Sequence, residues 1–116
     1  MTNNDFYWYW FTIAGIGVKT QKKLLEHFGH PSTIYNAPES EIKGILTTGQ
    51  CKEVIASKNQ KKIEASIRKL EKREIYFFHR ESQEYPERLA QLYEPPNLLY
   101  YIGRLPNFSK PILAIV

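Results

Sequence analysis

The stretch "FTIAGIGVKTQKKLLEHFG", residues 11–29, decides how the first part of the chain folds. Gly15 and Gly17 flank one apolar residue, Ile16, and amphipathic helical patterns lie on both sides of the three. A tight turn between two helices needs the backbone freedom that glycine supplies at little cost. The stretch therefore predicts a helix-hairpin-helix in which Ile16 fills the space between the two helices.

A hairpin of this kind would turn the first backbone N–H groups of its second helix outward, close to several lysines. N–H groups at a helix N-terminus and nearby cations together form a cradle for phosphate. Such a cradle touches only the DNA backbone and reads no base sequence. The predicted nucleic-acid-binding residues are Gly15, Gly17, Lys19, Lys22 and Lys23. The alternative is a plain connector in a helical protein-interaction domain, where such turns are common.

A second and weaker copy of the hairpin follows at an offset of 29 residues. Aligning residues 15–28 with residues 44–57 matches Gly, Ile, Gln and Lys at four of 14 positions, and it sets Leu25 opposite Val54. Leu46 stands where the first copy has Gly17, so the second copy lacks the second glycine. We expect the two hairpins to form one compact helical unit.

The remaining residues between 5 and 73 also carry helical patterns. The first helix has an apolar face at the spacing i, i+3, i+4 and i+7, formed by Phe6, Tyr9, Trp10 and Ile13. The aromatic run "YWYWF" (7–11) is therefore interpreted as core, although aromatic side chains can also stack on bases. The last helical pattern covers residues 60–74 and has an apolar face formed by Ile63, Ile67 and Leu70.

Capping and turn residues indicate where the helices begin and end. Gly29 is expected to end the second helix. Ser32 is expected to cap the next helix, and Thr48 to cap the one over residues 49–58. Pro38 is expected to open a short helix between them. The lysines of residues 58–73 are interpreted as a solvated helix face.

After Glu74 the pattern changes from helix to strand. "IYFFH" (75–79), "LLYYIG" (98–103) and "PILAIV" (111–116) are strand candidates, and "EYPERLAQL" (84–92) is a turn into a short helix that begins at Pro86. The last run has the periodicity of a buried helix as well, but its β-branched residues and preceding proline favour a strand. A second architecture is therefore expected to begin near residue 75.

Composition limits the class of protein. The chain has 116 residues, 42% of them hydrophobic and 24% charged, as in globular proteins outside the membrane. No apolar stretch approaches the ~20 residues of a membrane helix, and no Lys or Arg precedes Lys19, so a signal peptide is not expected. A single cysteine, Cys51, excludes an internal disulfide and favours the cytoplasm. We expect no contact with a membrane.

The net charge of +4 is unevenly distributed. Residues 1–80 hold 13 basic and 8 acidic side chains, whereas residues 81–116 hold 3 and 4. A basic surface attracts phosphate at long range, although many basic helical domains bind no nucleic acid.

No set of side chains predicts catalysis. A metal site made from His27, His30, His79 and Cys51 would lack the close ligand pairs that such sites usually have. No Ser/His/Asp set and no phosphate loop is present, and Gly15-x-Gly17 follows a helix, whereas a dinucleotide fingerprint follows a strand. We therefore expect a protein that is not an enzyme and has no cofactor or metal. A nucleotide-dependent enzyme of Rossmann type would need catalytic residues beyond Val116.

Three stretches together resemble the DNA-processing protein A (DprA/Smf) family. They are "IAGIGVKTQKKLLEHFG" (13–29), "EYPERLAQLYEPPNLLYYIGRL" (84–105) and "KPILAIV" (110–116). The second is the most specific, because it joins a Tyr-Pro-x-x-Leu motif, a double proline and an apolar strand that ends at Gly103. The resemblance covers the chain from about Trp10 onward.

The resemblance implies a mostly α fold with two parts. A SAM-like helix-hairpin-helix domain is expected over residues 1–74, followed by the first strands of an incomplete Rossmann-like α/β core over residues 75–116. Proteins of this family bind single-stranded DNA in natural transformation, mainly through that core, and help to load a RecA-type recombinase. None of the DNA-binding positions of the family's core maps onto residues 1–116, so none is carried over.

This chain is thus expected to be an N-terminal piece that at most assists DNA binding. Its expected partners are single-stranded DNA, the recombinase and, as a homodimer, a second copy of the chain. The alternative is a protein-interaction or self-association module that does not contact DNA.

Overall fold

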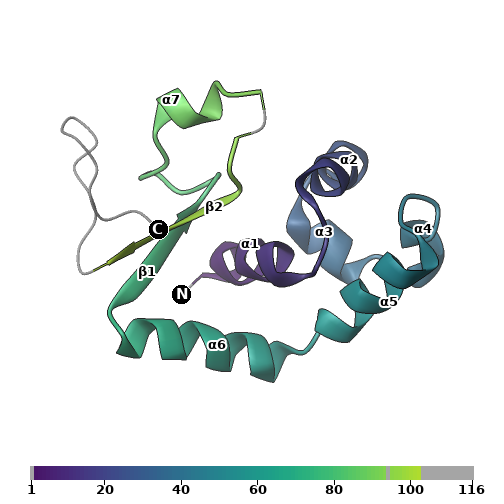
Figure 1. Ribbon diagram of the computed structural model, residues 1–116, viewed down its shortest axis with the longest axis horizontal. Helices are drawn as coiled ribbons and strands as arrows, with labels where there is room; N and C mark the ends of the chain where they lie inside the picture. The colour runs from purple at the N-terminus through teal and green to yellow at the C-terminus, as the bar shows by residue number, and fades with distance from the viewer. Residues whose placement is uncertain (1, 94, 103–116) are drawn as a thin grey trace. The chain divides into compact units, whose positions relative to one another are not determined.

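The computed structural model describes residues 2–93 and 95–102 (Figure 1). The chain divides into two compact units, Met1–Gln60 and Lys61–Val116. The first unit contains α1 (Asn3–Ile13), α2 (Val18–Phe28), α3 (Pro31–Asn36), α4 (Glu39–Ile42) and α5 (Thr48–Ser57). The second contains β1 (Ile75–His79), α7 (Glu87–Ala90) and β2 (Leu98–Ile102), and α6 (Gln60–Lys72) begins at the boundary. The predicted mostly helical character is confirmed.

Helix α1 buries a broader face than its periodicity predicts. Tyr9 and Trp10 are buried as expected, and Phe6 is half-buried. Ile13 is 42% exposed, so its assignment to the core face is wrong; Trp8 and Phe11 are buried in addition. The helix begins with a capping box, in which the Thr2 hydroxyl accepts from the Asp5 N–H and the Asp5 carboxylate accepts from the Thr2 N–H.

The core of the first unit forms around Trp10 and Phe11. Both side chains have no exposed surface, and α1 packs against α3. The Tyr35 ring of α3 meets the Trp10 ring edge-on at 4.9 Å between centroids. The indole Nε1–H of Trp10 donates to the Ser57 hydroxyl at 2.9 Å, which ties α1 to the end of α5. The buried Gln21 amide donates to the Phe11 carbonyl at 3.2 Å and links α2 to α1.

Two of the predicted caps are wrong by one or two residues. His30, and not Ser32, caps α3, because the His30 Nδ1 accepts from the Ser32 N–H at 3.0 Å. Thr47, and not Thr48, caps α5, where it forms a capping box with Gln50. Gly29 does end α2 as predicted: its φ is 85° and its N–H donates to the Leu25 carbonyl.

The second hairpin aligns with the first at an offset of 30 residues, and the predicted offset of 29 is wrong. Four positions then agree: the buried residue before each helix, the N-cap, and two buried positions inside each helix. These pairs are Ile16 and Leu46, Gly17 and Thr47, Gln21 and Cys51, and Leu24 and Val54. The turns themselves differ, because Gly15 has φ 80° whereas none of residues 43–47 has a positive φ.

The second unit contains the predicted helix and two of the predicted strands. Ile63 and Ile67 of α6 are buried and Leu70 is half-buried, as the apolar spacing predicts. Strands β1 and β2 pair antiparallel with Phe77 opposite Tyr100. Helix α7 is present, but Pro86 is its N-cap and Glu87 its first residue, one position later than predicted. The predicted strand in residues 111–116 lies outside the described residues.

The finer fold assignments stay predictions. Among the described residues the sheet has two antiparallel strands, and this pair is neither a Rossmann-like nor a SAM-like signature. The predicted division after residue 74 marks the change from α6 to β1, whereas the compact units divide between Gln60 and Lys61. Residues 1–74 and 75–116 as separate domains thus remain a prediction.

Candidate nucleic-acid interface

The Gly15-Ile16-Gly17 turn has the chemistry of a hairpin between two helices. Gly15 has φ 80°, in the left-handed region that glycine adopts at little cost. Ile16 is buried at 8% exposure, so it fills the interior as predicted. Gly17 is the N-cap of α2 with extended backbone angles, and a Cβ placed on it would meet nothing within 4 Å. Both glycines are exposed, so the backbone of the turn is open to a ligand.

The N-terminus of α2 has no side-chain cap, unlike those of α1 and α5. Gly17 has no side chain to accept from the first N–H groups, and the first turn of α2 contains no acidic residue. In α1 and α5 a threonine accepts from the third backbone N–H of the helix. The free N–H groups of a helix start carry roughly half a positive charge, which attracts anions. Among the N-termini of α1, α2 and α5, that of α2 therefore has the most backbone N–H groups without a side-chain acceptor, and these can donate to phosphate.

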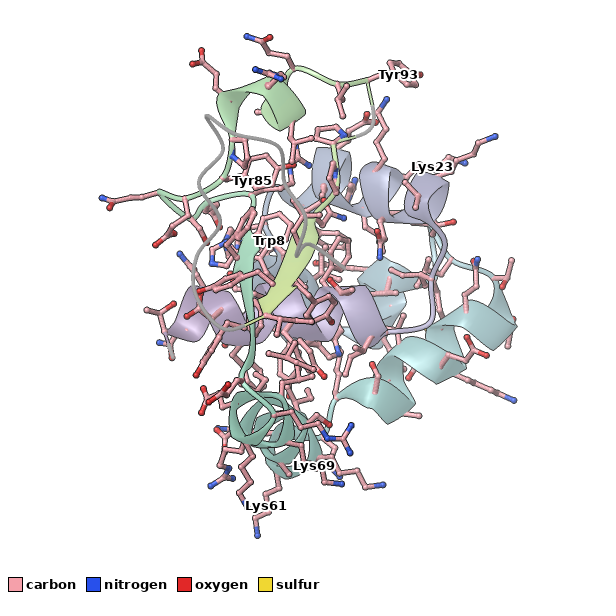
Figure 2. All side chains as sticks on the ribbon, turned by 60° about the vertical axis from the view of Figure 1, so that its left-hand side comes forward. Trp8, Lys23, Lys61, Lys69, Tyr85 and Tyr93 are labelled. Carbon is pink, nitrogen blue, oxygen red and sulfur yellow. The ribbon has the colours of Figure 1, made fainter. Side chains whose placement is uncertain are left out.

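The three predicted lysines lie on one face of α2. Residues three and four apart share a helical face, which brings Lys19, Lys22 and Lys23 together. Lys19 and Lys23 are exposed, and Lys22 is half-buried and has an interaction partner. Lys23 extends away from the α2 ribbon (Figure 2). Lys19 lies in the first turn, where a cation opposes the helix dipole and so does not favour the helix itself.

One acidic side chain at the hairpin was missed by sequence reasoning. A Cβ on Gly15 would lie 2.9 Å from Oε2 of Glu53, so this carboxylate of α5 lies directly beside the turn. A negative charge there repels phosphate and weakens the cradle. No sequence signal pairs Glu53 with Gly15, because only the tertiary arrangement of α5 brings the two residues together.

The aromatic run of α1 belongs to the core, as predicted from its helical spacing. Trp8, Tyr9, Trp10 and Phe11 are all buried, and Tyr7 is half-buried against the Tyr35 ring. A platform for stacking bases needs exposed ring faces. These rings therefore do not form one.

The histidines and the cysteine do not gather around a metal. Cys51 is buried, and the Nδ1 of His30 is used as the cap of α3. Over residues 2–93 and 95–102, no three His, Cys, Asp or Glu side chains converge as metal ligands. In the same residues, no helix is long and apolar enough to cross a membrane.

Comparison with known families concerns the last part of the chain. Residues 76–116 match the family model described as DNA recombination-mediator protein A. This part of the chain is DprA-like. The resemblance predicted from the Tyr-Pro and double-proline motifs is thereby confirmed for residues 76–116. No curated protein and no solved structure matches the chain.

The two motifs of the DprA-like part are joined by one hydrogen bond. The Tyr85 hydroxyl of the Tyr-Pro motif donates to the Pro96 carbonyl of the double proline at 2.6 Å. Burial raises the pKa of Tyr85 above its usual 10.0, so the phenol stays protonated and able to donate. The Tyr85 ring also packs edge-on against Phe78 of β1. These described motif residues therefore stabilise the connection between β1 and β2, which contains α7.

Proposed function

We propose that the protein handles single-stranded DNA in recombination and that unit Met1–Gln60 assists through contacts to the DNA backbone. The observation that carries the second part is the uncapped start of α2, where Gly17 supplies no side-chain acceptor and Lys19 and Lys23 are exposed. The DprA-like part supports the recombination role. Natural transformation and delivery of DNA to a RecA-type recombinase follow from the family resemblance.

The proposed contact is weak and independent of base sequence. One helix start carries about half a unit charge, and three lysines add a few phosphate contacts. The Glu53 carboxylate beside Gly15 opposes them. Each phosphate neutralised on a single strand contributes about 0.7 to the slope of log affinity against log salt. A slope near 2 is thus expected from this site alone.

The test replaces Lys19, Lys22 and Lys23 together by alanine. We expect the affinity of the 116-residue chain for a labelled single-stranded oligonucleotide to fall about tenfold at low salt, and the salt slope to fall by about 2. Fluorescence anisotropy at several salt concentrations measures both. The matched control removes three cations elsewhere, with Lys43, Lys52 and Arg88 replaced by alanine.

A second variant in the same test is expected to raise the affinity for the oligonucleotide. Glu53→Gln removes the repelling carboxylate beside Gly15 and is expected to strengthen binding up to about fivefold, since a unit charge pair at close range in water is worth about 1 kcal/mol. Glu41→Gln, on the exposed surface of α4, is its control. Unchanged affinity in both the triple variant and Glu53→Gln would contradict the proposed contact at α2.

A second candidate function is a protein-interaction or self-association module. Ile13 and Val18 lie on either side of the hairpin and are 42% and 57% exposed, and Ile55 of α5 is also exposed. Exposed apolar side chains mark a contact site for another protein where they form one contiguous patch, which is what this function requires of these three. This function predicts self-association by light scattering that Ile13→Ser and Val18→Ser abolish and the lysine variant leaves unchanged.

A further inference from the structure

Helix α6 and the residue after it carry the whole excess of positive charge. Residues 61–73 hold six basic side chains and two acidic ones, a net charge of +4. The entire chain also has a net charge of +4, so the other residues together are neutral. A concentration of charge in one short element indicates a local electrostatic role rather than a general one.

The six cations form a stripe along α6. With 3.6 residues per turn, they fall within an arc of about 140° around the helix axis. Ile63 and Ile67 lie on the opposite face and are buried, whereas the cations are exposed. Lys61 and Lys69 extend away from the α6 ribbon (Figure 2). We name this surface the α6 stripe; its members are Lys61, Lys62, Arg68, Lys69, Lys72 and Arg73.

Helix stability does not explain the whole stripe. Lys69 and Lys72 lie in the last turn, where cations favour the helix dipole. Lys61 and Lys62 lie near its start, where cations oppose the dipole, and the first turn has no acidic residue to compensate them. The stripe therefore contains charge that the helix would be more stable without.

Most of the stripe is not neutralised within the described part of the chain. There, Lys61, Arg68, Lys69 and Lys72 form no ion pair with a carboxylate. Glu64 and Glu71 fall beside the stripe, between it and the buried face, at helical positions that leave the arc itself purely basic.

We propose that the α6 stripe binds the phosphate backbone of single-stranded nucleic acid. A protein partner fits less well, because protein interfaces are depleted in lysine and depend on buried aromatic or aliphatic anchors. The stripe is mostly lysine and encloses one apolar side chain, the small Ala65. Lysine binds phosphate as a point charge without needing a fixed geometry.

The length of the stripe matches a short run of phosphates. Lys61 and Lys72 are 11 residues apart, which is about 16 Å along the helix axis. At about 3.4 Å of rise per nucleotide of a stacked strand, this distance spans at most four or five phosphates, and fewer if the strand is extended along the stripe. A flexible single strand can follow a straight line of charges, whereas the phosphates of a duplex wind away from it. The α6 stripe shares no residue with the start of α2, so each can be tested by its own variant.

The test replaces Lys61, Lys69 and Lys72 by glutamine, which has a helix propensity close to that of lysine. We expect a loss of affinity for a labelled single-stranded oligonucleotide of at least about tenfold at low salt. The salt slope is expected to fall by about 2, at roughly 0.7 per contact. The control variant carries Lys43→Gln, Lys52→Gln and Arg88→Gln, and circular dichroism shows that both variants are folded.

Each outcome decides the proposal. A loss in the α6 variant that the control does not show supports it, and so does weaker competition by duplex than by single strand. An unchanged slope in the α6 variant overturns it, even if the α2 lysine variant abolishes binding. An equal loss in the control also overturns it, because general charge attraction is then sufficient. If the wild-type chain binds nothing, this proposal and the proposed function both fail.

Discussion

Trp10→Ala is expected to lower the free energy of unfolding of the first unit by about 3–5 kcal/mol. Trp10 has no exposed surface and is the largest of the fully buried side chains among the described residues. Its removal leaves a cavity between α1 and α3, where the Tyr35 ring now packs. It also removes the indole N–H that donates to the Ser57 hydroxyl. The lost packing and the lost hydrogen bond both destabilise the core of the first unit.

Urea unfolding followed by circular dichroism measures this effect, and the control is Tyr7→Ala. Tyr7 is half-buried on the same helix, so its removal is expected to cost clearly less. Domains are stable by only about 5–15 kcal/mol, so the alanine variant can lose enough stability to unfold. In that case the milder Trp10→Phe replaces it in the measurement. A Trp10→Ala variant as stable as Tyr7→Ala would contradict the packing around α1.

Phe78→Ala is expected to destabilise the β1–β2 pair by about 3–4 kcal/mol. Phe78 is 2% exposed, and its ring contacts those of Tyr85 and Tyr101 at 6.1 and 6.2 Å between centroids. Phe78 thus packs against the Tyr85 side chain, which holds the double proline through the Pro96 carbonyl. The destabilisation is therefore expected to extend to the connection between the two strands, which contains α7.

Hydrogen exchange of peptides covering β1 and β2 measures this loss locally. The matched control is Tyr76→Ala, on the same strand but 36% exposed. We expect much faster exchange in the Phe78 variant and little change in the control. Equal protection of β1 in both variants would show that Phe78 is not central to this part of the fold.

Elements with a strong periodic pattern could be predicted from the sequence. Ile63 and Ile67 recur at helical spacing among charged residues, so the face of α6 was unambiguous. The β-prone run of β1 follows directly, and Gly29 ends α2 because its φ of 85° suits glycine. In each of these cases the local signal and the tertiary structure agree.

Local patterns gave wrong assignments where several neighbouring residues were equally suited to the same buried or capping position. Helix α1 is aromatic or apolar on most sides, so spacing could not show that Phe11 is buried and Ile13 exposed. Thr47 and Thr48 are adjacent and chemically identical, so the capping residue was decided by where the chain turns. The sequence alignment of the two hairpins paired Gly44 with Gly15. In the structure the buried Leu46 corresponds to Ile16, which shifts the alignment by one residue.

The candidate site could be predicted only in part. The hairpin glycines and Lys19 have local signals, and the structure finds all three exposed. Glu53 beside Gly15 has none, because its position depends on how α5 packs. The α6 stripe was visible as a charge run, but a solvated face has the same sequence pattern. The opposed helix dipole at Lys61 favours the proposed binding surface, and so does the lack of ion pairs at Lys61, Arg68, Lys69 and Lys72 within the described part of the chain. Both observations depend on the structure.

The most direct test of DNA contact within this chain is fluorescence anisotropy of the unaltered 116 residues with a labelled single-stranded oligonucleotide. We expect saturable binding that weakens steeply between about 50 and 200 mM salt and is equal for oligonucleotides of different base sequence. No binding at high micromolar protein, or binding that salt does not change, would contradict a phosphate-contacting surface in these residues.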